Sequence, residues 1–328
     1  MTLALFTSGG TISMTTPRGS SGATPRLRGR DFVDMTPGLT EIGHEIDVHD
    51  VVPVPSASLQ LATVLDIVRQ ASELVSGEHA GVILTLGTDT LEEVAYLIDL
   101  LWPCDEPFVV TGAMRNATLA GPDGPANLLA AAVVAADPAA RGMGAAVAFN
   151  DEVHAARWVR KQHSTSLATF GSPNQGPIGH VIENRFTALN VPRRLPSLAC
   201  PDPDTAACTR VALYTASFDD DGLLLDGVEE THDGLVVAAL GGGHVAASTA
   251  HRLADIAQRI PVVLASRTGA GPVLRKTYGA VGCEIDLQRR GLLNARYLDA
   301  FKARVLLRIL LSTGADREQI TTELHRRS

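Results

Sequence analysis

Short apolar runs alternate along this chain with longer segments in which apolar residues recur at helical spacing. The first runs are LALF, AGVILTLG, PFVVTGA and GAAVAFN, and helical spacing marks residues 58–76 and 91–101 between them. Strands that alternate with helices in this way are typical of a largely parallel sheet covered by helices. We therefore predict an α/β fold whose functional loops gather at the carboxyl ends of the strands.

The alternation lapses once, in the stretch RRLPSLACPDPDTAACTR, which is rich in Pro, Asp and small residues. It then resumes on a smaller scale with RVALYTA, GLVVAALGGG, a helix over 248–259, PVVLAS and a final helix over about 298–313. A lapse of this composition is typical of a linker between domains. We predict a larger amino-terminal catalytic α/β domain over 1–191, a linker over 192–209 and a smaller carboxy-terminal α/β domain over 210–328.

Composition narrows the classes of function. The chain has 328 residues, a hydrophobic fraction of 45% and a net charge of -8 without a long basic run, so nucleic acid is not an expected partner. Its four cysteines are scattered and its histidines lack metal-ligand spacing, which favours free thiols and no metal or other cofactor. No apolar stretch is long enough to cross a bilayer, and no export signal is apparent, so we expect a cytoplasmic protein without a membrane span.

Three loops that directly follow predicted strands hold the candidate chemistry. The first, TSGGTIS, carries Thr11 behind two glycines that let backbone amides approach a ligand, although such a loop is also suited to a phosphate or a plain turn. The second, GTDT, places Thr88 and Asp89 at a helix amino terminus, where either is also an ordinary cap. The third contains Asp123 and Asn127, which we interpret as structural because Asp-Gly-Pro favours a turn.

A segment without hydrophobic periodicity, residues 14–31, follows the first loop. Long insertions of this kind in a compact domain are often lids over a site. Its basic residues suit an anionic substrate as well as they suit a solvated loop, and they are Arg18, Arg26, Arg28 and Arg30.

TSGGTIS, GTDTLEEVAYLIDL and VVTGAMR...DGPANLLAA, in this order, resemble the signature blocks of the bacterial L-asparaginase and glutaminase-asparaginase family. The likeness continues through RKQHSTSLATFGSPNQGPIG, the GGGH turn and SRTGAGPV...FKARVLLRILL, so it covers nearly the whole chain. The resemblance implies hydrolysis of L-asparagine to L-aspartate and ammonia through a threonine acyl-enzyme. It also implies a homo-oligomer, a dimer or a tetramer built from dimers, with sites between subunits.

The resemblance assigns roles to particular residues. Thr11 matches the family's nucleophile, Thr88 and Asp89 match the second threonine and the carboxylate that holds the substrate's α-ammonium, and Lys161 matches the lysine that supports the second threonine. Ser56 is the best match for the serine that binds the α-carboxylate, with Ser58 two positions further as the alternative. The full set of implied substrate contacts is Gly10, Ser56, Ser58, Gly87, Thr88, Asp89, Ala113, Met114 and Glu284.

The chain departs from the family pattern at two places. Many relatives carry a tyrosine in the mobile loop, whereas the first tyrosine here is Tyr96. Either another group, such as Thr16 or a water, activates Thr11, or the activity is lower than that of the family's best members. Glu284 matches the glutamate that relatives lend to a neighbouring subunit, with a surface glutamate as the alternative. His244 stands where relatives commonly have asparagine, and Tyr278 is a further candidate for the same surface.

Other interpretations remain open on the sequence alone. The substrate range includes L-glutamine if the chain is a glutaminase-asparaginase, and a related amidase subunit supplies ammonia for transfer to charged tRNA. A non-catalytic member of the fold would bind asparagine or aspartate without hydrolysis. A nucleotide-binding module is disfavoured because TSGGT lacks a P-loop lysine.

Overall fold

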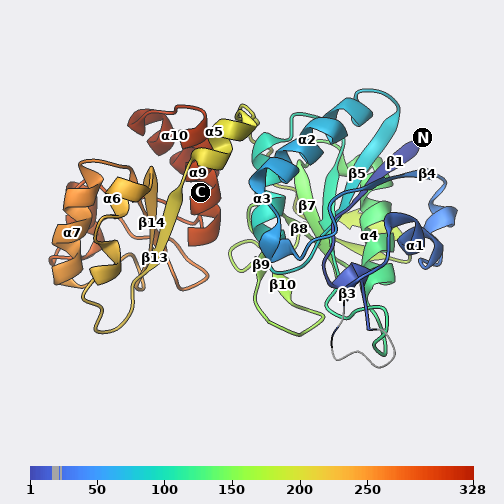
Figure 1. The fold of residues 1–328 in the computed structure, drawn as a ribbon, viewed down its shortest axis with the longest axis horizontal. Coiled ribbons are helices and arrows are strands. Elements are labelled where there is room, and N and C mark those ends of the chain that lie inside the picture. Colours follow the sequence, from blue (N-terminus) through green and yellow to red (C-terminus); the bar gives the residue numbers. More distant parts are fainter. Residues whose placement is uncertain (17–21, 23) are drawn as a thin grey trace. The chain divides into compact units, whose positions relative to one another are not determined.

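The computed structural model describes residues 1–16, 22 and 24–328, and the chain forms two compact units, Met1–Leu198 and Ala199–Ser328 (Figure 1). The predicted linker, 192–209, spans this division and contains a short helix, α5 (Pro203–Cys208). Each unit has its own sheet and its own buried core.

Unit 1 is built on an eight-stranded sheet in the order β12-β11-β8-β7-β6-β5-β1-β4. The five strands from β4 to β7 in this order pair in parallel, and β8, β11 and β12 extend the sheet in antiparallel fashion. The strands are β1 (Thr2–Thr7), β4 (Glu45–Asp50), β5 (His79–Thr85), β6 (Phe108–Thr111), β7 (Ala145–Phe149), β8 (Glu152–Ala155), β11 (Gly179–Ile182) and β12 (Arg185–Ala188). Two small ribbons, β2 (Met14–Thr15) with β3 (Thr24–Pro25) and β9 (Arg160–Lys161) with β10 (Phe170–Gly171), stand outside this sheet.

Helices cover both faces of this sheet. In Figure 1, α2 (Leu61–Val75) and α3 (Leu91–Leu101) lie on one side of the strands, and α1 (Gly29–Asp34) and α4 (Gly124–Ala136) lie on the other. Helix α4 is rich in alanine, and it comes so close to β5 that a Cβ added to Gly81 would lie 2.3 Å from the carbonyl oxygen of Ala135. Small residues therefore permit the tight packing of α4 on the sheet.

The carboxyl ends of four neighbouring strands align in one row. Asp50 of β4 is in register with Thr7 of β1, which is in register with Thr85 of β5, and Thr85 is in register with Thr111 of β6. Residues in register lie side by side on one face of a sheet. The loops that follow these strands therefore leave the sheet from a common edge, as expected for the site of an α/β protein.

Unit 2 has a four-stranded parallel sheet in the order β13-β14-β15-β16. Its strands are β13 (Val211–Thr215), β14 (Gly234–Ala239), β15 (Val262–Ser266) and β16 (Leu293–Asn294). Its helices besides α5 are α6 (Val228–Thr231), α7 (Ala247–Ala257), α8 (Glu284–Arg289), α9 (Ala300–Ser312) and α10 (Arg317–Arg327). Both units are therefore α/β, with the larger sheet in unit 1, which confirms the predicted fold class.

The last helix and the antiparallel extension of the first sheet were not among the predicted elements. Helix α10 is mostly polar, and it buries chiefly Ile320 and Leu324, which are four residues apart on one face. The antiparallel strands are four residues long, which is too short for a reliable periodic signal. Short or polar elements of this kind are fixed by tertiary contacts more than by local pattern.

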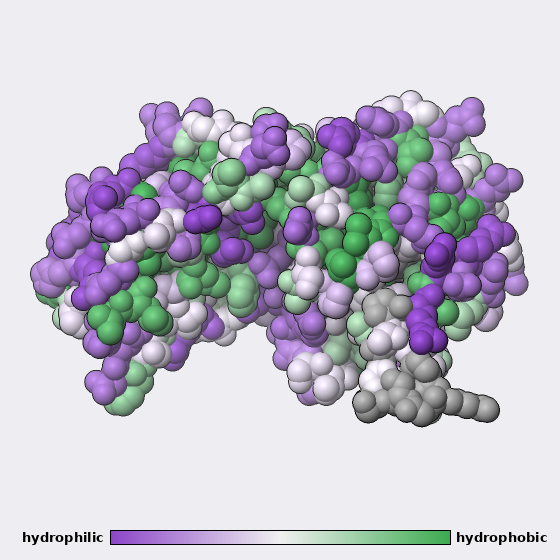
Figure 2. All heavy atoms as spheres, in the orientation of Figure 1, coloured by the Kyte–Doolittle hydropathy of each residue, from purple (hydrophilic) through white to green (hydrophobic). Residues whose placement is uncertain are grey.

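On the face shown in Figure 2, apolar side chains appear in small groups among polar ones. Phe218 and Leu224 are the most exposed large apolar side chains of unit 2 among the described residues. Among the described residues, no helix combines the length and the apolar character needed to cross a membrane.

A buried histidine lies beneath the β9–β10 ribbon. His154 of β8 is 1% exposed, its Nδ1 lies 3.1 Å from the hydroxyl of Ser172, and its Nε2 lies 3.2 Å from a carboxylate oxygen of Glu152. Burial, with a contribution from the charge of His180, lowers the pKa of His154 to about 4 from 6.5. The ring is therefore neutral in the folded protein at neutral pH.

This lowered pKa predicts loss of stability in acid. Between pH 6.5 and about 4 the unfolded chain binds a proton at His154 that the folded chain does not, so the free energy of unfolding falls by up to about 3 kcal/mol as pH decreases through this window. Urea titrations at several pH values, followed by tryptophan fluorescence, measure the effect, because both tryptophans, Trp102 and Trp158, lie in unit 1.

The variant His154→Gln should flatten this part of the pH profile, and the exposed His163→Asn should leave it as in the wild type. An equally steep profile in His154→Gln would contradict the assignment.

Candidate active site

A contact between two glycines brings the first two predicted loops together. Gly10 has φ 89°, and a Cβ added there would lie 2.3 Å from Cα of Gly87. A Cβ added to Gly87 would lie 2.8 Å from Oγ of Ser56. These three residues therefore interlock at the end of the sheet, and Thr11 and Thr88 each follow directly after one of the glycines.

Lys161 joins the second loop from a distant part of the chain. Its Nζ donates hydrogen bonds to Oγ1 of Thr88 at 2.9 Å and to Oδ1 of Asp89 at 2.8 Å. The Lys161 side chain is 17% exposed, whereas that of Asp89 is 74% exposed. The structure thus groups the hydroxyl and the ammonium in a partly enclosed position and leaves the carboxylate open to a ligand.

Thr11 begins a 3-10 turn, η1 (Thr11–Ser13), directly after Gly10. Thr11 is partly exposed, and its hydroxyl has no hydrogen-bond partner among the described residues. Tyr96 is buried inside α3, and Thr16 is exposed with its backbone N–H on the hydroxyl of Thr118. The hydrogen bonds of these described residues therefore identify no group that activates Thr11.

The two candidate serines differ in their surroundings. Ser56 is buried beside Gly87, and its hydroxyl has no partner among the described residues. Ser58, in the same short turn η3 (Ser56–Ser58), is exposed. A buried hydroxyl without a partner is costly unless a ligand or water bonds to it, so the geometry favours Ser56 over Ser58 as a substrate contact.

The third loop is held by the carboxylate of Asp123. This carboxylate accepts hydrogen bonds from the backbone N–H groups of Met114 and Arg115 and from the side chain of Asn127. Asn127 also donates to the carbonyl oxygen of Gly112. Asp123 and Asn127 thus brace the loop rather than face a ligand, which confirms their structural interpretation, and Ala113 is fully buried behind Met114.

Sequence reasoning missed Asp50, which anchors the predicted lid. Its Oδ1 accepts hydrogen bonds from the hydroxyl of Thr7 at 2.7 Å and from the N–H of Gly29 at 2.9 Å. These two bonds, with the charge of Arg28, lower the pKa of Asp50 below its ordinary value against a small opposing effect of burial. A cavity of about 180 Å³ between Thr7, Leu27 and Asp50 adjoins this anchor. No strand was predicted over 45–50, so the sequence analysis had no reason to single out Asp50.

The described part of the predicted lid is ordered around this anchor. β2 pairs with β3, and the N–H groups of Arg26 and Leu27 donate to the carbonyl oxygen of Ser13. Arg30 forms an exposed ion pair with Asp34. Arg18 lies outside the described residues.

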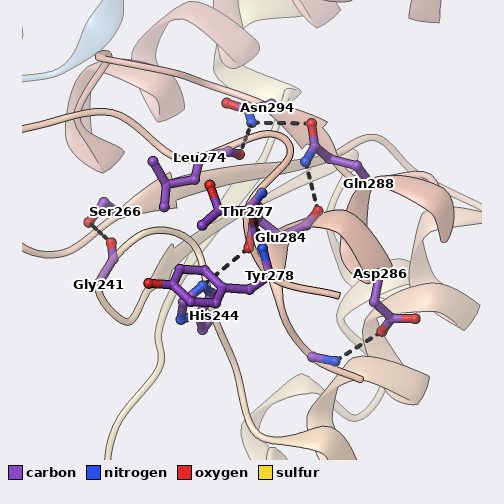
Figure 3. Close-up of polar contacts among 11 residues, drawn as sticks. Gly241, His244, Ser266, Leu274, Thr277, Tyr278, Glu284, Asp286, Gln288 and Asn294 are labelled. Carbon is purple, nitrogen blue, oxygen red and sulfur yellow. Dashed lines mark hydrogen bonds and ion pairs between the residues drawn. The ribbon is translucent and has the colours of Figure 1, made fainter. Parts of the chain in front are cut away.

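Glu284 lies at the start of α8 in unit 2 and is fully buried (Figure 3). Its Oε1 accepts hydrogen bonds from the N–H groups of Thr277 and Tyr278, each at 2.7 Å, and its Oε2 lies 3.2 Å from Nε2 of His244. The ring of Tyr278 stands edge-on to that of His244 at 5.1 Å between centroids. Glu284 thus holds His244 and the half-exposed Tyr278 at the surface of unit 2.

The electrostatics of Glu284 agree with this arrangement. Burial by itself raises the pKa of the carboxyl, but the N–H groups of Tyr278 and Thr277, and then His244, outweigh it, so that the pKa lies below the ordinary value. The carboxylate is therefore charged and occupied within its own unit. A contact between Glu284 and substrate remains a prediction.

The candidate site contains no metal centre that the structure reveals. Among residues 1–16, 22 and 24–328, no three His, Cys, Asp or Glu side chains gather in a way that could hold a metal ion. Lys161 instead gathers the hydroxyl of Thr88 and the carboxylate of Asp89, and hydroxyl, ammonium and carboxylate groups suit proton transfer and nucleophilic chemistry.

Comparison with known families decides the affiliation of the chain. A family model described as "Asparaginase, N-terminal" matches residues 2–193, and one described as "Glutaminase/Asparaginase C-terminal domain" matches residues 210–323. The chain belongs to the asparaginase family. It is therefore an amidohydrolase, as its sequence motifs predicted.

Individual relatives of this asparaginase-family chain agree over most of its length. It is 37% identical to a protein named probable L-asparaginase from Deinococcus radiodurans, over 97% of this chain and 95% of that protein. It is 35% identical to L-asparaginase 2 of Escherichia coli, over 73% of this chain and 68% of that protein. The structure of a probable cytoplasmic L-asparaginase from Campylobacter jejuni superposes with a TM-score of 0.89 at 26% identity, covering 99% of both chains.

The contact between Gly10 and Gly87 predicts how a methyl group added at position 10 affects stability and activity. Gly10→Ala combines an unfavourable φ with a backbone collision at Gly87, so it should destabilise unit 1 by about 1–3 kcal/mol. It should also reduce amidase activity about 100-fold, because displacement of the loops by about 1 Å misplaces Thr11, the candidate nucleophile.

Gly43→Ala is the matched control for this variant. Gly43 also has a positive φ, 76°, but an added Cβ there meets nothing within 4 Å. It should lose stability through strain and retain activity, as measured by urea unfolding and ammonia release. Equal activities of Gly10→Ala and Gly43→Ala would contradict the importance of the glycine contact.

Proposed function

We propose that this chain is an L-asparaginase that hydrolyses L-asparagine to L-aspartate and ammonia through an acyl-enzyme on Thr11. The observation that carries this proposal is the pair of hydrogen bonds from Lys161 to Thr88 and Asp89, next to the contact of Gly10 with Gly87. The names of the Deinococcus, Escherichia and Campylobacter relatives support asparagine as the substrate.

In this proposal, one carboxylate and one hydroxyl of the protein bind the two charged groups of the substrate. The exposed carboxylate of Asp89 holds the α-ammonium of asparagine, and the buried hydroxyl of Ser56 donates to its α-carboxylate. The side-chain amide of the substrate is thereby directed between the two threonines.

The reaction then proceeds in two steps. Oγ1 of Thr11 attacks the amide carbon, the C–N bond breaks, and the proton from the Thr11 hydroxyl reaches the leaving nitrogen, so that ammonia departs. The pair of Thr88 and Lys161 carries this proton, since Lys161 is bonded to the Thr88 hydroxyl. Water next attacks the ester, which releases L-aspartate and returns a proton to Thr11.

Backbone amides supply the remaining stabilisation. We assign this role to the N–H groups of Thr11 and Thr88, which directly follow Gly10 and Gly87 in the loops after β1 and β5. Donors that face a developing oxyanion contribute about 3 kcal/mol each to stabilisation of the transition state.

The decisive experiment measures ammonia release from L-asparagine and L-glutamine by the wild type, Thr11→Ala and Thr88→Ala. Thr11→Ala should lose at least about 1,000-fold in kcat, and a quenched wild-type reaction should show the acyl group on the peptide that contains Thr11. Thr15→Ala, on β2 of the same segment, serves as control and should retain activity.

Three results would contradict parts of this proposal, and each leads to a different conclusion. No ammonia from either amide by the wild type would refute the enzymatic function. Full activity in Thr11→Ala would move the nucleophile to Thr88. Equal kcat/KM for the two amides would identify a glutaminase-asparaginase.

We further propose that the active form is a homo-oligomer with sites between subunits, as the family resemblance implies. The surface pair of His244 and Tyr278, fixed by Glu284, supports this proposal because it offers aromatic and polar groups to a second copy. Light scattering during size-exclusion chromatography should show a dimer or tetramer, and a fully active monomer would contradict it.

A cytoplasmic location is likewise a proposal. The Campylobacter relative is named cytoplasmic, whereas a Haemophilus influenzae relative with 35% identity is named periplasmic. Cell fractionation distinguishes the two, and recovery of the protein in the periplasm would exclude the proposed location.

A further inference from the structure

Glu92 is a buried acid in the first turn of α3, three residues after Asp89. Its side chain reaches away from its own helix to the β9–β10 ribbon. There its Oε2 accepts a hydrogen bond at 2.9 Å from the backbone N–H of Lys161.

This bond completes a closed set of contacts between Lys161 and the start of α3. The backbone of Lys161 is fastened to α3 through Glu92, and the side chain of Lys161 returns to the start of the same helix through Thr88 and Asp89. The backbone and the side chain of Lys161 are therefore both attached to the start of α3. A lysine side chain has several rotatable bonds, so its Nζ is placed accurately only when its backbone is fixed as well.

Within the ribbon, little else fixes this backbone position. The next residue, Gln162, donates its N–H to the carbonyl oxygen of Thr169, and Lys161 is in register with Phe170. The ribbon has only two residues in each strand. So short a ribbon is not rigid by itself and depends on its attachments.

We propose that Glu92 is a positioning residue for catalysis: by accepting the Lys161 N–H it holds the lysine amine on Thr88. This inference rests on the proposed function for its effect on turnover. It assigns to Glu92 no contact with substrate, and its effect on turnover is transmitted through Lys161.

A simpler account is that Glu92 merely stabilises the positive end of the α3 dipole. Glu93 stands next to it in the same helical turn with the same charge, so the dipole contribution is common to both residues. No bond from Glu93 to Lys161 accompanies it. The difference between matched variants at the two positions therefore isolates the bond to Lys161.

The kinetic test uses ammonia release from L-asparagine. Glu92→Ala should lower kcat about 10- to 100-fold, and Glu92→Gln, which retains an acceptor oxygen, should stay within about threefold of the wild type. Glu93→Ala should likewise stay within about threefold of the wild type. If Glu92→Ala does not fold, Glu92→Asp replaces it, because this variant keeps the charge but is one methylene too short for the bond.

A double-mutant cycle with Lys161→Met separates positioning from general stabilisation. In the Lys161→Met background, the change of Glu92 to Ala or Asp should reduce kcat no further, because the group that Glu92 positions is gone. Effects that multiply in the double variant would overturn the proposal. So would a kcat of Glu92→Asp equal to that of the wild type.

Hydrogen–deuterium exchange tests the bond without reference to activity. The Lys161 amide should be protected in the wild type, Glu92→Gln and Glu93→Ala, and it should exchange at least about 10-fold faster in Glu92→Asp. Unchanged exchange in Glu92→Asp would overturn the inference even if the wild type proved inactive on asparagine. An inactive wild type with the expected exchange pattern would instead refute only the proposed function.

Discussion

The site depends on one steric constraint, the direct contact of the backbone at Gly10 with the backbone at Gly87. No side chain fits between these residues, so the loop after β1 and the loop after β5 meet at van der Waals distance. Every other candidate group is placed relative to this contact: Ser56 packs on Gly87, Thr11 and Thr88 follow the two glycines, and Lys161 bonds to Thr88. The missing Cβ atoms permit this approach of the two loops, and any side chain at Gly10 or Gly87 would force them apart.

Around this contact, the fold supplies three separate anchors. Asp50 fastens the segment near Gly29 to the end of β1, Asp123 braces the third loop, and Glu92 fastens the ribbon of Lys161 to α3. Each anchor is a carboxylate that accepts a backbone N–H. Backbone N–H groups in a loop, in the first turn of a helix or at the edge of a short ribbon have no partner from regular structure, and an acidic side chain that accepts from them fixes that segment.

The sequence predicted the regular elements well because their physical causes are local. Helix α3 spans the predicted 91–101, and β1, β5 and β6 follow the predicted apolar runs within a few residues. The α10 helix and the antiparallel strands of unit 1 were missed, since few apolar residues mark them. For the site, the chain pattern indicated the loops of Thr11 and Thr88. The part played by Lys161 came only from the family resemblance, because 72 residues separate it from Asp89. The anchors Asp50 and Glu92 had no periodic signal at all.

The distance of Lys161 from its partners along the chain also has a consequence for folding. Gly10 and Gly87 are separated by 87 − 10 = 77 residues, and Lys161 bonds to Thr88 across 73 more. Contacts between residues so far apart form late, after the loss of chain entropy that brings them together. A ribosome must therefore release almost all of unit 1 before the three segments can assemble. A partly synthesised chain that ends before the β9–β10 ribbon would contain Thr88 and Asp89 without Lys161, so the proposed site would stay incomplete until that ribbon had been made.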